Sequence, residues 1–481
     1  MSALSWVIVA IPLGLALAVL VVPSRAGRYA TAIGSITCAA CIGVLLVRIA
    51  GGEGRLDALS ALFLAPVAIV YGSVGLYCLW YVRAEPIGAN GEERYRREFL
   101  ALTNAFACAE IVVPLLSNMA ALWVALEVTT ILAALLVRLQ GSDAALEAAW
   151  KYLLVASCGL ALGLIGVVVL YASGTGALGS HYAPLWSSFM AVSSKLDSNA
   201  LRLAFIFALI GFGTKMGLAP MHTWLPDAHG AGPTPTSAML SGVLLSDALY
   251  VILRFAAIAN AALGTGMTQR SFFIVGLLSL FVGAFFLLRQ RDIKRMLAYS
   301  SIEHMGIIAC GLAFGAPLAL AGALLHVVNH AAAKALAFYG AGRLAARYDT
   351  REIERIRGAA TILPISGTLF AMAALALAGM PPFGPFRSEL MILSGGFSGL
   401  AWPVAIVVVG LLLVAFAGIT RWTIAMTAGA APQGVQRGDR DPAAIAAMVA
   451  VFTVVLVIGL YVPTPLAVLI ANAGAIVRGH P

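Results

Sequence analysis

The sequence predicts an all-helical integral membrane protein of about fourteen transmembrane helices, and its composition is the first reason. Of its 481 residues, 61% are hydrophobic and 11% are charged, and the mean hydropathy is +0.96. A soluble domain carries about 25% charged residues. Apolar runs of the roughly 17 to 25 residues that span a bilayer recur from the first residues almost to the last. We therefore expect one membrane domain without a soluble catalytic domain.

The apolar runs, taken in order, define the expected helices. The first run, Ala3 to Pro23, has about the length of a full span and no basic leader, so we expect it to be retained as a helix and not removed as a signal peptide. Short polar connectors separate the later runs. The expected helices cover residues 3–23, 29–48, 57–82, 99–117, 119–137, 150–172, 201–225, 236–257, 272–289, 297–315, 317–341, 363–398, 401–424 and 444–471.

The basic residues predict the orientation of these helices. The net charge is +9, and arginines gather in the connectors after the first, third, ninth, eleventh and thirteenth helices. Such residues mark the cytoplasmic side of a membrane protein. Both termini are therefore expected outside the cell's inner, cytoplasmic membrane. The same distribution argues against a nucleic-acid partner, which would require a basic patch or stripe.

Cysteines give no sign of a metal or redox centre. All six lie within apolar runs, where they act as small core residues. The sequence also lacks a haem, iron–sulfur or nucleotide motif. We expect no cofactor and no redox chemistry within this chain.

Two of the expected helices contain glycine and proline near their middle. The seventh is interrupted around Gly217 and Pro220, and the twelfth around Gly379 and Pro382. The two breaks are five helices apart, which predicts two inverted five-helix repeats with a broken helix at the same place in each. The alternative is that these residues only kink lipid-facing helices. The expected divisions are 1–98 for helices one to three, 99–257 and 258–424 for the two repeats, and 425–481 for the last helix.

Lysines inside apolar helices point to an ion pathway. The chain has five lysines, and Lys151, Lys215 and Lys334 lie within apolar runs or at their mouths. A buried lysine or acid costs on the order of 2.5 to 3.5 kcal/mol. Lys215 lies beside the seventh-helix break, and Glu127 lies near the middle of the fifth helix. Burial disfavours the charged forms of both residues, and a nearby opposite charge favours them again. We therefore expect this pair to exchange protons. A static ion pair is the alternative.

The eleventh helix carries a stripe of ionisable side chains. His326, His330 and Lys334 are spaced by four residues and so share one helix face. Neutral imidazole both donates and accepts hydrogen bonds, which suits a proton relay. Structural hydrogen bonding is one alternative. A zinc site is another, although no third ligand is evident in the sequence.

Other ionisable residues in or beside apolar runs are candidates for the same path. A single acid at Glu110 is also explained by a hydrogen bond to a neighbouring helix. The remaining candidates are Asp247 in the eighth helix, Glu303 and His304 in the tenth, Glu389 in the twelfth, and His222 and His229 beside the seventh-helix break.

Residues 215–229, KMGLAPMHTWLPDAH, resemble the core signature of a known family. These are the antiporter-like subunits of respiratory complex I, of Mrp-type cation/proton antiporters and of membrane-bound hydrogenases. Residues 292–301, 326–330 and 379–384 support the resemblance, which covers about residues 100 to 400. The run YSSIEH at 299–304 is most similar to the component F branch of hydrogenase-4 and formate hydrogenlyase complexes.

The resemblance implies fourteen helices, inverted repeats and a lateral proton path along buried charges. It assigns Glu127, Lys215 and Glu389 to the family's functional positions in the fifth, seventh and twelfth helices. Lys334 falls where some members keep a lysine. Many members also carry a lysine after Gly-Val-Leu-Leu in the eighth helix, where this chain has Ser246 followed by Asp247. The middle of the path therefore either uses Asp247 and water or is altered.

Together these features predict a proton-translocating membrane subunit of a redox-driven complex. Its expected partners are other membrane subunits and a peripheral redox arm. Two alternatives belong to other classes. One is a sodium/proton antiporter subunit of the Mrp type, and the other is a membrane anchor for a redox arm that translocates nothing, an interpretation that Ser246 favours.

Overall fold

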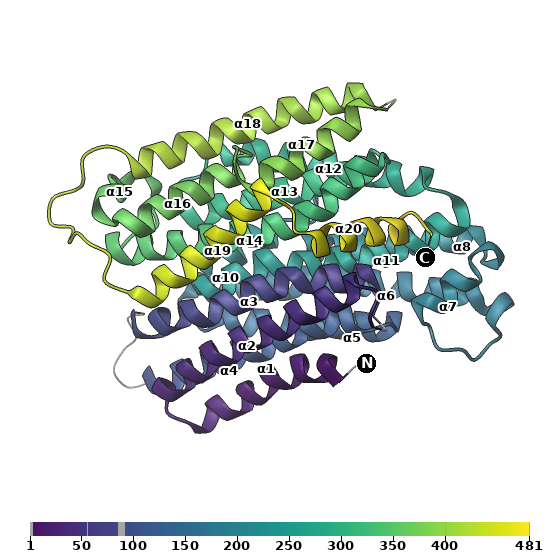
Figure 1. The fold of residues 1–481 in the computed structure, drawn as a ribbon, viewed down its shortest axis with the longest axis horizontal. Coiled ribbons are helices and arrows are strands. Elements are labelled where there is room, and N and C mark those ends of the chain that lie inside the picture. Colours follow the sequence, from purple (N-terminus) through teal and green to yellow (C-terminus); the bar gives the residue numbers. More distant parts are fainter. Residues whose placement is uncertain (1–2, 55, 85–91, 400, 481) are drawn as a thin grey trace.

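The computed structural model describes residues 3–54, 56–84, 92–399 and 401–480. They form a bundle of helices whose axes are roughly aligned (Figure 1). Within this described part, the chain has no β-strand and thirteen helices that are long and apolar enough to cross a membrane. Two consecutive shorter helices, Pro364–Leu377 and Gly384–Phe397, provide a further crossing. The expected class, an all-helical protein with about fourteen spans, is confirmed.

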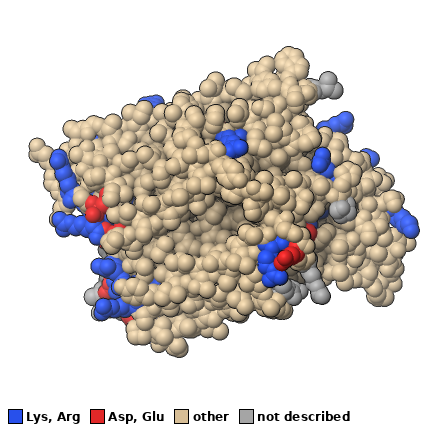
Figure 2. All heavy atoms as spheres, viewed as in Figure 1, with Lys and Arg blue, Asp and Glu red and all other residues tan. Residues whose placement is uncertain are grey.

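On the face shown in Figure 2, most charged side chains lie toward the two ends of the bundle, and the surface between them is mostly uncharged. This distribution is expected of a protein whose middle faces lipid. The N- and C-terminal ends of the chain lie at the same end of the bundle (Figure 1). A chain that crosses a membrane an even number of times ends on the side where it began.

Three helices precede the segment in which most candidate residues lie. The third is largely buried, whereas only about a third or less of the apolar stretch is buried in each of the first two. They are α1 (Ala3–Val21), α2 (Ser24–Ala50) and α3 (Ala58–Ala84).

The next segment contains the first broken helix and a buried crossing built from three consecutive elements. The short helices α7 and η1 lie between the expected helices 150–172 and 201–225, where the sequence predicted a connector. The elements are α4 (Glu92–Leu115), α5 (Met119–Arg138), α6 (Asp143–Leu178), α7 (Trp186–Ala191), η1 (Ser193–Lys195), α8 (Ser198–Met216), α9 (Trp224–Ala231), α10 (Thr234–Met239), the π-helical turn η2 (Leu240–Leu244) and α11 (Leu245–Leu263).

The remaining elements contain the second broken helix. They are α12 (Gly266–Leu287), α13 (Ile293–Ala313), α14 (Pro317–Tyr348), η3 (Ile353–Arg355), α15 (Ala359–Ile362), α16 (Pro364–Leu377), α17 (Gly384–Phe397), α18 (Trp402–Thr427), α19 (Pro442–Leu460) and α20 (Thr464–Val477). The expectation of one continuous helix over 444–471 is wrong, because the chain is extended at Tyr461 and Pro463. Proline cannot donate a helical hydrogen bond and disfavours helix in the residue before it.

The seventh and twelfth crossings are interrupted where glycine and proline gather. After α8 the backbone of Gly217 has φ 79°, and after α16 that of Gly379 has φ 71°, a region that favours glycine. Buried side chains hydrogen-bond to backbone carbonyls beside each break. The indole of Trp224 donates to Thr214 O at 2.8 Å, and Asn329 Nδ2 donates to Gly384 O at 2.7 Å. Non-helical backbone at membrane depth is tolerated when it is buried in this way.

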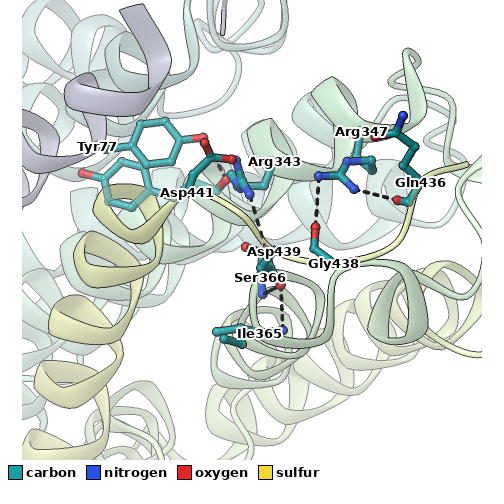
Figure 3. Close-up of polar contacts among 10 residues, drawn as sticks. Tyr77, Arg343, Arg347, Ile365, Ser366, Gln436, Gly438, Asp439 and Asp441 are labelled. Atoms are coloured by element: carbon teal, nitrogen blue, oxygen red, sulfur yellow. Dashed lines mark hydrogen bonds and ion pairs between the residues drawn. The ribbon is translucent and has the colours of Figure 1, made fainter. Parts of the chain in front are cut away.

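The segment between α18 and α19 anchors the start of α16 (Figure 3). Asp439 accepts hydrogen bonds from the backbone N of Ile365 at 2.9 Å and of Ser366 at 3.1 Å. Arg343 of α14 lies 3.4 Å from Asp439 and 2.6 Å from Asp441. Burial disfavours the charged form of Asp439, but its hydrogen bonds with Ser366, Ile365 and Arg343 outweigh burial and hold its pKa below the usual range. The carboxylate therefore fixes the first half of the second broken helix.

Candidate functional site

Most candidate residues lie inside the bundle, and those exposed by less than 10% form a row that crosses it from α4 to α17. Glu127 and His222 are half-buried. The buried members are Glu110, Lys215, His229, Asp247, Glu303, His304, His326, His330, Lys334 and Glu389.

Lys215 of α8 contacts α5 without the direct contact to Glu127 that the alternative of a static ion pair requires. Its Nζ donates to Leu126 O at 2.7 Å and to Thr130 Oγ1 at 2.5 Å. Glu127, the residue after Leu126, instead accepts a hydrogen bond from Ser157 of α6 at 2.8 Å. Among the described residues, Lys215 has no direct salt bridge to Glu127, although the two charges interact electrostatically. Helix periodicity alone did not show that Leu126 and Thr130 of α5 contact Lys215 while Glu127 contacts Ser157.

Two buried acids complete the first half of the row. Glu110 of α4 and Asp247 of α11 interact electrostatically with each other and with Lys215. Neither carboxylate has a hydrogen-bond partner among the residues that the structure describes. A buried carboxylate is costly unless water, a cation or a bound proton compensates for its burial. The structure thus brings Glu110, the less certain candidate from sequence, next to Asp247.

In the second half, side chains of three helices form a hydrogen-bonded chain. Nδ1 of His304 on α13 lies 2.9 Å from Nε2 of His326 on α14. Nδ1 of His326 lies 2.9 Å from the hydroxyl of Ser388 on α17. Asn329 donates to the same hydroxyl at 3.0 Å. Because each ring nitrogen is a donor or an acceptor according to its tautomer, this chain can pass a proton by reversing its hydrogen bonds.

Charged groups flank the histidines. Glu303 precedes His304 and lies 3.6 Å from its Nε2. Lys334, which interacts electrostatically with Glu303, donates to Leu297 O at 2.7 Å. The expected stripe of His326, His330 and Lys334 is fully buried.

Glu389 supplies an acid beside the histidines that the sequence did not place there. Ligand atoms of His304, His326 and Glu389 all lie within 4.8 Å of one another, a set that could hold a metal ion. His330, the second ligand of the zinc alternative, is outside this set among the described residues. The two imidazoles are already hydrogen-bonded to each other, so these two nitrogens are not both free to bind a metal ion in this arrangement.

The crossing formed by α10, η2 and α11 connects the two halves. Nε2 of His330 lies 3.3 Å from Ser241 O in η2, and the hydroxyls of Ser241 and Ser301 lie 2.8 Å apart. Asp247 follows on the same crossing. Single π-helical turns inside α-helices are frequent at functional sites. This crossing therefore contacts His330 of the second half and carries Asp247, an acid that interacts with Lys215 in the first half.

Three residues differ from their expected surroundings or lie beside the row. The expectation that Lys151 is buried is wrong, because its side chain is 51% exposed and pairs with Glu147 at 2.5 Å and Asp227 at 3.4 Å. Lys151 begins its apolar run at the end of the bundle, where a long side chain reaches water. His222 is half-buried, whereas His229 is buried with its Nδ1 2.9 Å from Leu225 O.

An all-helical membrane bundle with two interrupted helices and a buried row of lysines, acids and histidines defines an antiporter-like membrane subunit. The chain belongs to the transmembrane family described as NADH:quinone oxidoreductase/Mrp antiporter, which matches residues 117–415. The family resemblance based on residues 215–229 is thereby confirmed.

Similar proteins agree with this membership. A hydrogenase-4 component F homolog from Methylacidiphilum infernorum is 37% identical over 72% of this chain and 72% of its own length. The chain spans about half the length of some other curated relatives. A subunit of the archaeal membrane-bound sulfane sulfur reductase has the same fold, with a TM-score of 0.85, 22% identity and coverage of 99% and 98% of the two chains. A chain of Thermus thermophilus respiratory complex I gives a TM-score of 0.83 at 23% identity, with coverage of 99% and 100%.

Proposed function

We propose that this chain translocates protons as the membrane subunit of a larger, redox-driven complex. The observation that carries the proposal is the row of buried ionisable side chains, with the His304, His326 and Ser388 hydrogen-bonded chain in its second half. Ionisable groups inside a membrane are expensive and mark ion pathways. Family membership supports the same function.

The geometry suggests how protons move along the row. A proton arriving at Glu389 or Glu303 enters the histidine chain, which passes it by exchanging donor and acceptor roles. Lys334 and Lys215 respond to the changed charge, because each lies in the field of buried acids. In the first half, Glu110 and Asp247 have no hydrogen-bond partner among the described residues and need water to join them to the row.

Partners and orientation are parts of the proposal. The arginine-rich connectors support placing both termini outside the inner membrane. The sulfane sulfur reductase is described as a respiratory membrane complex, which supports other membrane subunits as partners here. A peripheral redox arm would supply the driving force. The interruptions after α8 and α16 support the division into two repeats at 99–257 and 258–424.

Replacing the central lysine tests proton translocation. Lys215→Ala removes the cation that interacts electrostatically with both Glu110 and Asp247. We expect proton uptake by sealed vesicles carrying the complex to be abolished while the complex still assembles. Lys195→Ala, at an exposed position, is the matched control and should pump normally. Normal pumping by Lys215→Ala contradicts the proposal.

Purification of the complex in mild detergent, followed by mass spectrometry of the co-purifying subunits, separates the alternatives. A hydrogenase or quinone-reductase arm supports the redox-driven function. Recovery of small membrane antiporter subunits alone, together with a sodium-dependent pH change in vesicles, supports sodium/proton exchange. Redox activity without any proton uptake by the natural protein supports an anchor that translocates nothing.

A further inference from the structure

Arg254 is a buried charge that the row described above does not use. It lies on α11 seven residues after Asp247, which places it on the same helix face about 10 Å nearer the end of the bundle. Its side chain is 1% exposed, and Nη2 donates to the two carboxylate oxygens of Asp57 at 2.8 and 2.7 Å. Burying an ion pair costs free energy that its own attraction hardly recovers. Packing alone therefore gives no strong reason for this pair.

Tyr250 lies between Asp247 and Arg254 on the same helix. Its hydroxyl is 2.9 Å from Ser60 Oγ of α3 and accepts a hydrogen bond from Arg254 Nη2 at 3.0 Å. Arg254 also donates to Ser60 Oγ at 2.7 Å. A continuous hydrogen-bonded path thus runs from Tyr250 through Ser60 and Arg254 to Asp57.

Asp247 and Glu110, which have no hydrogen-bond partner in the described part of the chain, lie one helical turn from this path. Asp247 precedes Tyr250 by three residues on α11. Glu110 precedes Pro114 by four residues on α4, and the Tyr250 hydroxyl lies 3.4 Å from Pro114 O. Residues three or four apart share a helix face. Both acids therefore lie on the helix faces that carry the inner end of the path, one turn away from it.

The outer end of the path opens into a cavity of about 230 Å³. Asp57 and Ser60 line it, and the side chain of Asp57 is 18% exposed. Leu4 and Ser5 also line it, so it lies at the end of the bundle that holds the chain termini (Figure 1). A water molecule occupies about 30 Å³ of liquid, so this volume holds several.

From these contacts we propose that Tyr250, Ser60 and the Arg254–Asp57 pair form the proton exit of the first half. The inference rests on the proposed proton translocation. A proton leaves the carboxyl group of Asp247 or Glu110 through a bridging water, the Tyr250 hydroxyl accepts it while giving its own proton to Ser60, and Ser60 passes one proton to water beside Asp57. One proton enters the path and one leaves it, and every hydroxyl ends as it began. Arg254 keeps Asp57 and Ser60 in position.

A matched pair of tyrosines tests the proposal in the whole complex. Tyr250 and Tyr339 are both fully buried, and each hydroxyl lies 2.9 Å from a serine of α3, Ser60 and Ser73 respectively. Tyr250→Phe is expected to slow proton translocation by about tenfold or more, the order of effect of removing a proton-transfer group, and to change the solvent deuterium isotope effect. Tyr339→Phe should leave both unchanged. Equal effects of the two variants overturn the exit path.

A second pair covers the case in which Tyr250→Phe does not fold. Ser60→Ala should slow translocation severalfold, and Ser73→Ala on the same helix should not; equal rates overturn the proposal. Proton uptake by the unmodified complex is measured in the same vesicles. If that complex moves no protons, the proposed function itself fails. If it pumps and the paired variants behave alike, only the exit path fails.

Discussion

The two halves of the buried row both place ionisable groups inside the bundle, but they use different side chains. Around Lys215, the acids Glu110 and Asp247 have no hydrogen bond to any described residue. Around Lys334, His304 and His326 are linked directly to each other and to α17. An ionised carboxylate only accepts hydrogen bonds, whereas neutral imidazole accepts and donates. Two neutral imidazoles can therefore hydrogen-bond to each other directly, whereas two ionised carboxylates cannot.

If protons move along the row as proposed, this difference makes transfer in the two halves depend on different properties. In the second half, transfer requires side chains held at hydrogen-bonding distance, so it is sensitive to geometry. In the first half, transfer requires a hydrated space and a balance of charge, so it is sensitive to electrostatics. The acids that hold the two broken helices also differ in exposure. The side chain of Asp439, which binds the start of α16, is 2% exposed, whereas that of Asp227 in α9 is 23% exposed.

The largest expected contrast is between a histidine and an acid variant. His326→Gln keeps a polar group but cannot relay a proton, and we expect it to slow proton uptake by sealed vesicles about tenfold or more. Asp247→Asn should slow it less, because Glu110 leaves a second carboxylate beside Lys215. His181→Gln, at an exposed position, is the control. The reverse order would show that direct hydrogen bonding does not control transfer in the second half.

A smaller effect is expected on the stability of the second half. Asp439→Asn removes a charge that accepts hydrogen bonds from α16 and pairs with Arg343, which should cost about 1 to 3 kcal/mol at neutral pH. The pKa of Asp439 is lower in the folded protein, so its stabilisation is complete above the unfolded pKa and is lost as pH falls through the folded pKa. Thermal unfolding in detergent as a function of pH measures the difference.

The same unfolding experiment contains its control. Glu354→Gln changes an exposed acid near the end of α14 and should leave the melting midpoint unchanged at every pH. A destabilisation by Asp439→Asn that persists below the folded pKa would show that its charge is not the cause.

The smallest effect is expected at the anchor of the first broken helix. Lys151 pairs with Glu147 and Asp227 while exposed, and exposed ion pairs contribute little. Lys151→Ala should leave both the rate of proton uptake and the melting midpoint close to those of the natural protein. A loss of transport comparable to that of Lys215→Ala would place Lys151 in the path after all.

The sequence by itself determined the class of fold and the identity of the charged positions. Membrane spans follow from the length of apolar runs, and the breaks after Met216 and Leu377 follow from glycine and proline, because both properties are local to the chain. The spacing of His326, His330 and Lys334 likewise fixed a shared face, since one helix has one period. The family followed from the run at 215–229.

Tertiary structure decided which of these positions meet. Lys215 binds Thr130 and not Glu127, Glu110 joins Asp247, and Lys151 lies in the open. The buried contacts of Arg343 and Arg254 gave no signal in the sequence, because both residues read as ordinary arginines of a connector and a helix end. Periodicity fixes a side chain's direction within its own helix. The rotation and neighbours of that helix are set only when all the helices pack together.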